Sequence, residues 1–255
     1  MSVSTKIAGF KAMLCFDNCW QLIVNRLLFR TNIDIYRFKG CKIIVDYDGG
    51  DAAGVRECLT SDMYRQLLSE MKLPGPLSIL DCGANGGGFP LLLHTEGYKF
   101  SQVVSVEMNP YTHSRLQYNL VNNIDGIVFC LNQIVADTVK EHIIRFSSGS
   151  TGDSLFNVND IGKQFTICAT NINRLISTYF DTKTIDITKI DIEGAEYLLF
   201  SGENYSLLKQ SRYLVIEIHS VSGHTPIEVV DKIEQLGFTL LRQSADVYQF
   251  ANKNL

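Results

Sequence analysis

The residues best suited to chemistry in this sequence are an acid and the glycines that follow it. Asp81 ends an apolar run, residues 77–80, that is typical of a buried strand, and glycines 83 and 86–88 then require a tight turn. Pro90 and the leucines after it are typical of the first turn of a helix. Without side chains at such a turn, the backbone can approach a ligand and free N–H groups can point at it. The pattern therefore predicts a nucleotide-type binding loop.

A second acid stands where a ribose-binding residue is expected. Residues 102–106 form another apolar strand pattern, which ends at Glu107, at about the usual distance after Asp81. An acid in this position accepts hydrogen bonds from ribose hydroxyls, although a solvated strand-end carboxylate is the alternative. The next strand, residues 126–131, ends at Asn132, where the adenine of a bound nucleoside would lie.

Further acids follow a fourth strand. The alternating isoleucines of residues 184–190 predict a buried strand that ends at Asp191 and Glu193. A right-handed crossover places this strand beside the first, so its acids open into the same crevice as the glycine turn. Residues 213–219 predict a fifth strand with Glu217 and His219 on one side.

The end of the chain helps to decide between two kinds of α/β sheet. Residues 238–242 and 247–250 are strand patterns joined by four residues, and so short a link requires an antiparallel hairpin. A dinucleotide-binding dehydrogenase would continue with parallel crossovers instead. We therefore predict a Rossmann-like α/β fold of the class I methyltransferase type: a seven-stranded, mostly parallel sheet with a C-terminal antiparallel hairpin.

The first 75 residues are predicted to form a helical and β cap that precedes a binding domain at 76–255. They contain an amphipathic helix at 7–29, a hairpin at 33–47 and a helix at 55–71. The apolar face of the first helix is expected to pack on the body or on a partner chain, and peripheral membrane contact is the alternative. The polar residues 147–154 form a loop, either a plain connection or, less favoured, a substrate lid.

Composition limits the classes of protein. The 255 residues carry a net charge of −4, so no general basic surface indicates nucleic-acid binding. Seven scattered cysteines without a CxxC pair indicate reduced thiols in a cytoplasmic setting, not a disulfide framework or a zinc site. Charged residues interrupt every apolar stretch before a membrane-spanning length of about 18 residues.

Two motifs resemble those of a known family. Residues 81–89, DCGANGGGF, look like the D-x-G-A-N-x-G-x-[FY] loop of FkbM-type S-adenosylmethionine-dependent methyltransferases. Residues 189–196, KIDIEGAE, look like that family's K-x-D-x-E-G-A-E signature. Residues 107–110 stand where the family has E-P-x-P, and Met108 departs from that pattern while the acid is retained. The resemblance covers roughly residues 75–220 and leaves the N-terminal region unexplained.

The resemblance implies transfer of a methyl group from S-adenosylmethionine to a hydroxyl of a sugar, polysaccharide or secondary metabolite. The donor methyl is already activated, so the protein must align the acceptor oxygen and help to remove its proton. We expect the base to be a carboxylate or a histidine, among Asp191, Glu193 and His219. A Mg²⁺ site made by these three residues and Glu217 is a less favoured alternative. The cofactor-binding residues are expected to be Asp81, Gly83, Ala84, Asn85, Gly87, Glu107, Met108 and Asn132.

Two other functions stay open at this point. One is an NAD(P)-binding oxidoreductase, which the terminal hairpin disfavours. The other is a catalytically silent cofactor-binding protein, against which the intact Glu107, Asp191 and Glu193 speak. The sequence names neither the acceptor nor the oligomeric state.

Overall fold

The computed structural model describes residues 12–146, 162–181 and 183–255. Its centre is a seven-stranded sheet in the order β11-β12-β10-β9-β3-β4-β5. Six strands run in the same direction, and the seventh, β12, is antiparallel to both of its neighbours, β10 and β11. This arrangement confirms the predicted sheet and its C-terminal hairpin. The strands are β3 (Leu77–Cys82), β4 (Phe100–Val106), β5 (Ile127–Leu131), β9 (Ile185–Ile190), β10 (Ser211–Glu217), β11 (Phe238–Ser244) and β12 (Val247–Asn252).

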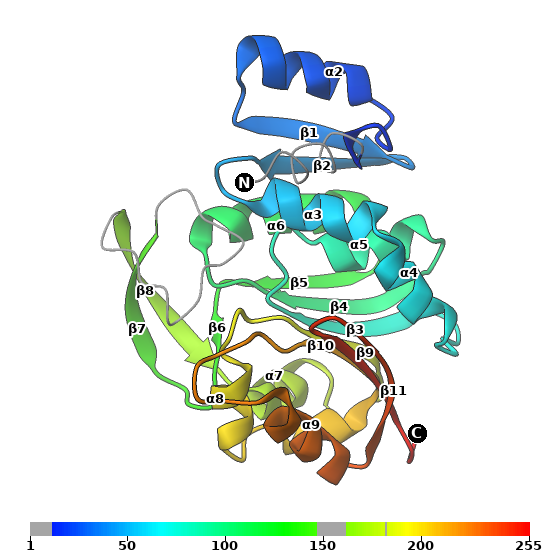
Figure 1. The fold of residues 1–255 in the computed structure, drawn as a ribbon, viewed down its shortest axis with the longest axis vertical. Coiled ribbons are helices and arrows are strands. Elements are labelled where there is room, and N and C mark those ends of the chain that lie inside the picture. Colours follow the sequence, from blue (N-terminus) through cyan, green and yellow to red (C-terminus); the bar gives the residue numbers. More distant parts are fainter. Residues whose placement is uncertain (1–11, 147–161, 182) are drawn as a thin grey trace.

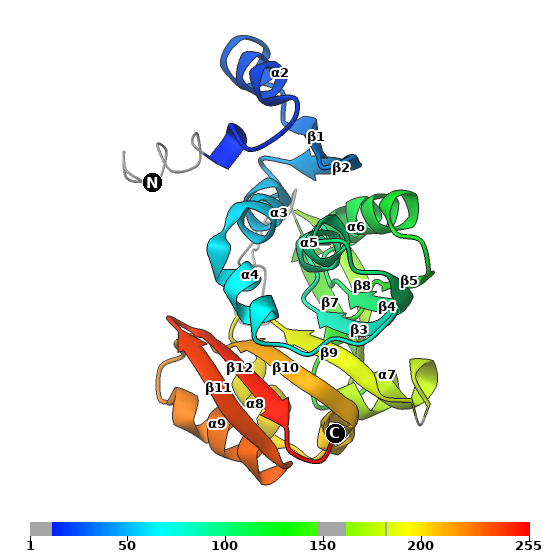
Figure 2. The ribbon, with the colours of Figure 1, turned by 90° about the vertical axis from the view of Figure 1, so that its right-hand side faces the viewer.

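Helices cover both faces of this sheet, as Figures 1 and 2 show. Successive residues of the central strand face opposite sides: Ile79 packs in one hydrophobic cluster and Leu80 in the other. Burial on both faces explains why the strand is an unbroken apolar run in the sequence. One face carries α3 (Asp51–Thr60), α5 (Gly88–Thr95) and α6 (Pro110–Asn123), and the other carries α7 (Ile172–Tyr179), α8 (Glu196–Ser201), the 3₁₀ turn η2 (Ser206–Gln210) and α9 (Pro226–Gln235).

Two helices begin directly after an asparagine that caps them. The Asn109 side chain accepts a hydrogen bond from Tyr111 N at 2.9 Å, directly before Pro110. The Asn171 side chain accepts one from Arg174 N at 2.8 Å. Each cap satisfies an N–H group that has no partner within the helix.

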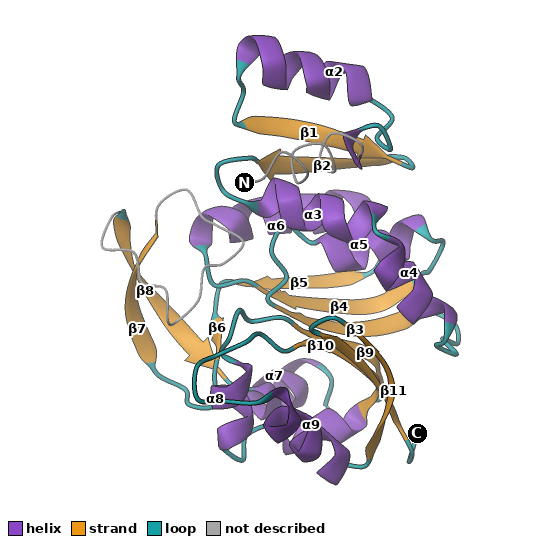
Figure 3. Cartoon of the chain, in the orientation of Figure 1, coloured by secondary structure: helices purple, strands orange, loops and turns teal. Residues whose placement is uncertain are grey.

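A small second sheet lies beside the main one (Figure 3). It consists of β6 (Ile134–Val135), β7 (Glu141–Phe146) and β8 (Lys163–Thr170), in the order β6-β8-β7. Strands β7 and β8 pair antiparallel, and β6 pairs in parallel with β8. The loop predicted at 147–154 lies outside the described residues.

The N-terminal region differs from prediction in its helices. Instead of one helix over 7–29, the described part has α2 (Cys19–Val24) and a π-helical turn, η1 (Asn25–Phe29), after a break near Asn18. The Asn18 side chain bonds the backbone of the neighbouring strand instead, donating to Ile35 O at 2.9 Å and accepting from Arg37 N at 3.0 Å. The helix predicted at 55–71 is two helices, α3 and α4 (Asp62–Ser69), because Ser61 leaves the helical conformation and caps α4.

The predicted hairpin is present and is hydrogen-bonded to α6, one of the helices that cover the main sheet. Strands β1 (Ile33–Phe38) and β2 (Cys41–Asp46) pair antiparallel. The Asn119 amide of α6 accepts from Ile44 N at 2.7 Å and donates to Ile44 O at 2.9 Å, as a further strand would. Residues on both sides of position 75 share one hydrophobic cluster, among them Val55 and Leu77. The proposed division at that position stays a prediction.

Two further observations concern the surface and the thiols. Several large apolar side chains of the α2–η1 segment are exposed, including Trp20, Leu28 and Phe29. Within the described ranges, no helix has the length and apolar character needed to cross a membrane. All seven cysteines lie in those ranges, and each is a free thiol.

Candidate functional site

The glycine turn and the acidic strand end meet at the carboxyl edge of the sheet. Strands β3 and β9 pair in parallel, and Asp191 N donates to Cys82 O at 2.9 Å just beyond them. Gly83 has φ +78°, and a Cβ atom there would lie 1.6 Å from Asp191 O. Only glycine fits this approach, and the two segments therefore share one crevice, as predicted.

The turn continues in a conformation that its residue types favour. Asn85 has φ 50°, in the left-handed region that asparagine tolerates better than most residues. Its N–H donates to Glu107 Oε2 at 3.0 Å. Gly87 also has positive φ, but a Cβ there would press on Leu116 and Leu120 of α6, so this glycine allows close helix packing.

A pocket opens at this edge, between the strand ends and α3 and α4. Most of the predicted cofactor residues line it; Gly87 and Asn132 do not. The lining includes Gly54, Glu57, Cys58, Tyr64, Asp81, Gly83, Ala84, Asn85, Gly88, Glu107, Met108, Gln133, Lys189, Asp191, Glu193 and Glu217.

The Glu107 carboxylate is held by backbone donors on both sides. Its Oε2 accepts from Asn85 N, and its Oε1 accepts from Asn109 N at 2.8 Å. Asn132 lies behind this segment, where its amide donates to Glu107 O and Met108 O, each at 2.9 Å. The neighbouring Gln133 lines the pocket in its place.

Asp81 is a fully buried acid on the pocket wall. Neither carboxylate oxygen has a hydrogen-bond partner among the residues that the structure describes. Burial raises the pKa of Asp81 to about 6, against the opposing effect of Lys189. A buried carboxylate without a partner is costly, so this one is suited to receive a cationic donor group of a ligand.

Lys189 is the buried cation of the site. Its Nζ lies 2.8 Å from Asp191 Oδ2, and its exposed fraction is 4%. Burial lowers the pKa of Lys189, but Asp191, Tyr64 and Asp81 together raise it well above its ordinary value. The ammonium therefore stays charged and fixes one oxygen of Asp191.

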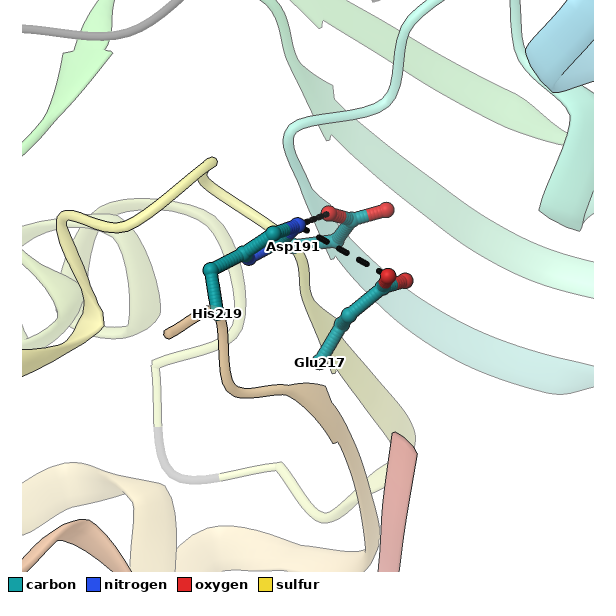
Figure 4. A group of neighbouring side chains, drawn as sticks. All are labelled: Asp191, Glu217 and His219. Carbon is teal, nitrogen blue, oxygen red and sulfur yellow. Dashed lines mark ion pairs between the residues drawn. The ribbon is translucent and has the colours of Figure 1, made fainter. Parts of the chain in front are cut away.

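His219 lies next to Asp191, surrounded by acids (Figure 4). The fifth strand was predicted to extend to His219, but β10 ends at Glu217, so His219 lies just after the strand. Its Nδ1 lies 3.2 Å from Oε1 of the fully buried Glu196. Its Nε2 lies 3.4 Å from Glu193 Oε2, 3.6 Å from Glu217 Oε1 and 4.0 Å from Asp191 Oδ1.

This crowding changes the pKa values of the cluster. Burial, and then the charge of Asp191, raises the pKa of Glu193 to about 7 and also raises that of Glu217. The hydrogen bond with Glu196, together with the nearby acids, raises the pKa of His219 to about 9. The structure thus brings the three predicted catalytic residues, Asp191, Glu193 and His219, together. His219 is outside the pocket lining and contacts it through the acids.

A comparison with protein families decides what this site belongs to. The model of the Methyltransferase FkbM domain matches residues 81–240, which is more than half of the chain. The chain belongs to the FkbM methyltransferase family. The family and the sheet together make this protein a methyltransferase, as the sequence motifs predicted.

Solved structures similar to this FkbM methyltransferase are distant from it. Methyltransferase FkbM from Methylobacillus flagellatus KT has 16% identity and TM-score 0.46, covering 72% of this chain and 45% of that one. Magnesium protoporphyrin IX methyltransferase from Synechocystis PCC 6803, solved with bound SAM, has 13% identity and TM-score 0.45, covering 80% and 84%. TrmK from M. capricolum, solved with S-adenosylhomocysteine, has 12% identity and TM-score 0.42, covering 77% and 70%. No curated protein matches the sequence.

Several pocket residues of the FkbM methyltransferase were missed from the sequence. Glu57 and Cys58 of α3 and Tyr64 of α4 form the wall opposite the strand ends. Burial raises the pKa of the Cys58 thiol to about 12, so it is neutral near pH 7. Glu196, the last residue of the 189–196 motif, was not among the expected site residues, yet it contacts His219. No spacing in the sequence reports these contacts, because they depend on how α3 and α8 pack.

Proposed function

We propose that this FkbM methyltransferase transfers the methyl group of S-adenosylmethionine to a hydroxyl of a sugar, polysaccharide or secondary-metabolite acceptor. The observation that carries the proposal is the cluster of Asp191, Glu193 and His219 beside the glycine turn. An alcohol hardly ionises at neutral pH, so an oxygen acceptor needs a group that takes its proton. A nucleophile that is already neutral and basic would not need this excess of carboxylates.

The donor fits the residues on the other side of the pocket. S-adenosylmethionine supplies a methyl group activated by its sulfonium, together with a cationic amino group and two ribose hydroxyls. The unpartnered carboxylate of Asp81 is suited to the amino group, and Glu107 at the end of β4 to the ribose. Gly83, Ala84, Asn85 and Met108 line the pocket; we assign the first three to the backbone that approaches the donor and Met108 to contact with its adenine. Gly87 and Asn132 do not line the pocket, and we propose that they hold the pocket-lining residues in position.

On the acceptor side, Lys189 holds Oδ2 of Asp191, and the acidic groups around His219 surround the incoming hydroxyl. We propose that one of the three groups takes the proton while the others orient the acceptor for in-line attack. A general base of this kind contributes about 10²–10⁴-fold to a rate.

We further propose that the protein acts in the cytoplasm on a small-molecule or glycan acceptor, with no nucleic acid as partner. The free thiols support a reducing compartment. Peripheral membrane contact through the N-terminal segment, and a homo-oligomer, stay predictions. The exposed Trp20 and Leu28 are compatible with either.

The test has two steps. Calorimetric titration with S-adenosylmethionine, S-adenosylhomocysteine and NAD⁺ should show binding of the first two and not of the third. Labelled S-adenosylmethionine is then supplied with a panel of sugars, glycans and phenols, and the product is analysed by mass spectrometry. An O-methyl ether, stable to mild base, supports the proposal. Transfer to nitrogen or carbon would refute it, and absence of donor binding would leave a catalytically silent protein.

A further inference from the structure

We propose that the acidic cluster around His219 is a divalent-cation site whose protein ligands are Asp191, Glu217 and His219. One ligand atom from each of the three lies within 4.8 Å of the other two. Figure 4 shows the imidazole nitrogen and the two carboxylates directed toward one another. They come from two adjacent strand ends, after β9 and β10.

The hydrogen bond between His219 Nδ1 and Glu196 determines which imidazole nitrogen is available as a metal ligand. Glu196 Oε1 lies 3.2 Å from His219 Nδ1 and also accepts from Ile192 N at 3.1 Å. An ionised carboxylate only accepts hydrogen bonds, so Nδ1 carries the proton and donates it. Nε2 is then the nitrogen directed at Glu193, Glu217 and Asp191. A buried carboxylate behind a histidine is the usual way in which a metal-binding imidazole is oriented.

The distances around Nε2 suit a shared ion better than direct hydrogen bonds. Nε2 lies 3.6 Å from Glu217 Oε1 and 4.0 Å from Asp191 Oδ1, the oxygens of the two proposed carboxylate ligands, and both distances exceed the ordinary hydrogen-bond range of about 2.7–3.2 Å. Two ligand atoms that are each about 2.1 Å from one ion lie about 3–4 Å apart. The observed separations therefore match ligands placed around a cation.

The charge of the cluster gives an independent reason for a cation. Four carboxylates, from Asp191, Glu193, Glu196 and Glu217, lie around only two groups that can carry positive charge: the His219 imidazole, and Lys189, which is committed to Asp191 Oδ2. Glu196 is fully buried, and its Oε2 has no hydrogen-bond partner within the described part of the chain. Such an excess of partly buried negative charge is unfavourable unless a further positive charge compensates it.

The chemistry of the ligands indicates the class of ion. One imidazole nitrogen with carboxylate oxygens suits a divalent cation such as Mn²⁺ or Mg²⁺, whereas a thiolate-selecting ion would find no cysteine among the proposed ligands. Asp191 and Glu217 line the pocket, so the open coordination positions face the acceptor.

The role of the cation in the reaction rests on the proposed function. An acceptor hydroxyl bound to the cation becomes more acidic. Its proton passes to the carboxylate of Glu193, which is not among the three ligands. The oxygen then forms its bond to the methyl carbon, and the sulfonium of the donor becomes a neutral thioether. The cation thus lowers the pKa of the acceptor hydroxyl, and the base accepts the proton.

Mn²⁺ is the probe for the test. The full-length protein is freed of metal with a chelator and titrated with Mn²⁺, and free Mn²⁺ is followed by electron paramagnetic resonance. We expect one site per chain, competed by Mg²⁺, and at least about tenfold weaker binding in His219→Gln and Glu217→Gln. The control variants are His224→Gln and Glu228→Gln, which break an exposed histidine–glutamate pair 3.0 Å apart and should leave Mn²⁺ binding unchanged.

A second measurement keeps the proposal falsifiable if the variants do not fold. Nitrogen chemical shifts of the His219 imidazole in the wild-type protein should show that Nε2 carries a proton in the metal-free protein at pH 7 and loses it when Mg²⁺ is added. No saturable Mn²⁺ binding at millimolar concentration, or a protonated Nε2 that ignores the metal, would overturn the cation site.

Failure of the cation site and failure of the proposed function give different results. If O-methylation proceeds at full rate in chelator and no Mn²⁺ binds, the function stands and the cation site is wrong. If Mn²⁺ binds at His219 but the methyl group goes to nitrogen or carbon, the site stands and the proposed acceptor is wrong.

Discussion

A Cβ atom on Gly83 would lie 1.6 Å from the carbonyl oxygen of Asp191, although the two residues are far apart in the sequence. The loop that would bind the donor and the strand end that would bind the acceptor therefore touch through their backbones. Replacing Gly83 should disturb both sides at once.

We expect Gly83→Ala to lower the free energy of unfolding by about 3 kcal/mol and to abolish donor binding. Gly75→Ala is the matched control, because Gly75 also has positive φ but has open space around it. In that variant the free energy of unfolding should fall only by the cost of the left-handed conformation, about 1–2 kcal/mol, and donor binding should be normal. Thermal unfolding and titration with S-adenosylhomocysteine measure both effects. Equal losses in the two variants would show that the contact with Asp191 is unimportant.

Asp81 should make donor binding depend on pH. Its pKa is raised to about 6, so the carboxylate is charged at pH 7.5 and becomes neutral as the pH falls through that value. Donor affinity should therefore decrease below about pH 6 in the wild-type protein. Asp81→Asn should bind about 10–100-fold more weakly at pH 7.5 and lose this pH dependence. Unchanged affinity in Asp81→Asn would mean that the donor amino group binds elsewhere.

Glu107 should contribute both to the turn and to ribose recognition. Its two oxygens accept from Asn85 N and Asn109 N, and a glutamine can satisfy only one of these donors with its oxygen. We expect about tenfold weaker donor binding in Glu107→Gln. A cycle with 2′-deoxy-S-adenosylhomocysteine separates the two roles. If Glu107 binds the ribose, removing the 2′-hydroxyl weakens binding to the wild-type protein and has little effect in the variant.

Glu96 should connect the N-terminal hairpin to the main domain. Its Oε1 lies 2.8 Å from Lys39 Nζ and 3.1 Å from Arg65 Nε. These partners, Lys39 first, lower the pKa of Glu96, so the stabilisation is present above its ordinary value of 4.5 and is lost as the pH falls through the lowered pKa.

We therefore expect Glu96→Gln to unfold more easily than the wild-type protein by about 0.5–1 kcal/mol at pH 7. The difference should be absent in acid, at a pH below the lowered pKa of Glu96. Glu141→Gln, on the exposed Glu141 of β7, is the control and should change stability little at either pH. Urea unfolding at both pH values measures the differences, and a loss in Glu96→Gln that persists in acid would rule out the ion pairs as its cause.

The sequence by itself determined the main sheet and the residues around the glycine turn. The short apolar run of β3, followed at once by turn-forming glycines, favours a buried strand, and the short link between β11 and β12 permits only a hairpin. Asn109 and Asn171 are caps because their side chains bond the next turn of backbone, which is a local interaction. Asp81, Glu107 and Asp191 were found because each lies at the carboxyl end of a strand, and parallel strands end at one edge.

Only the tertiary structure decided the contacts that cross between elements. The breaks at Asn18 and Ser61 were missed, since at Asn18 the helix competes with bonds to β1, and at Ser61 a cap interrupts a continuous apolar pattern. Helices α3 and α4 form one wall of the pocket, and Glu196 contacts His219. Both arrangements depend on packing between segments far apart in the chain. Residue spacing reports the face of an element, whereas the distance from an imidazole to its neighbouring carboxylates is set by how those elements pack.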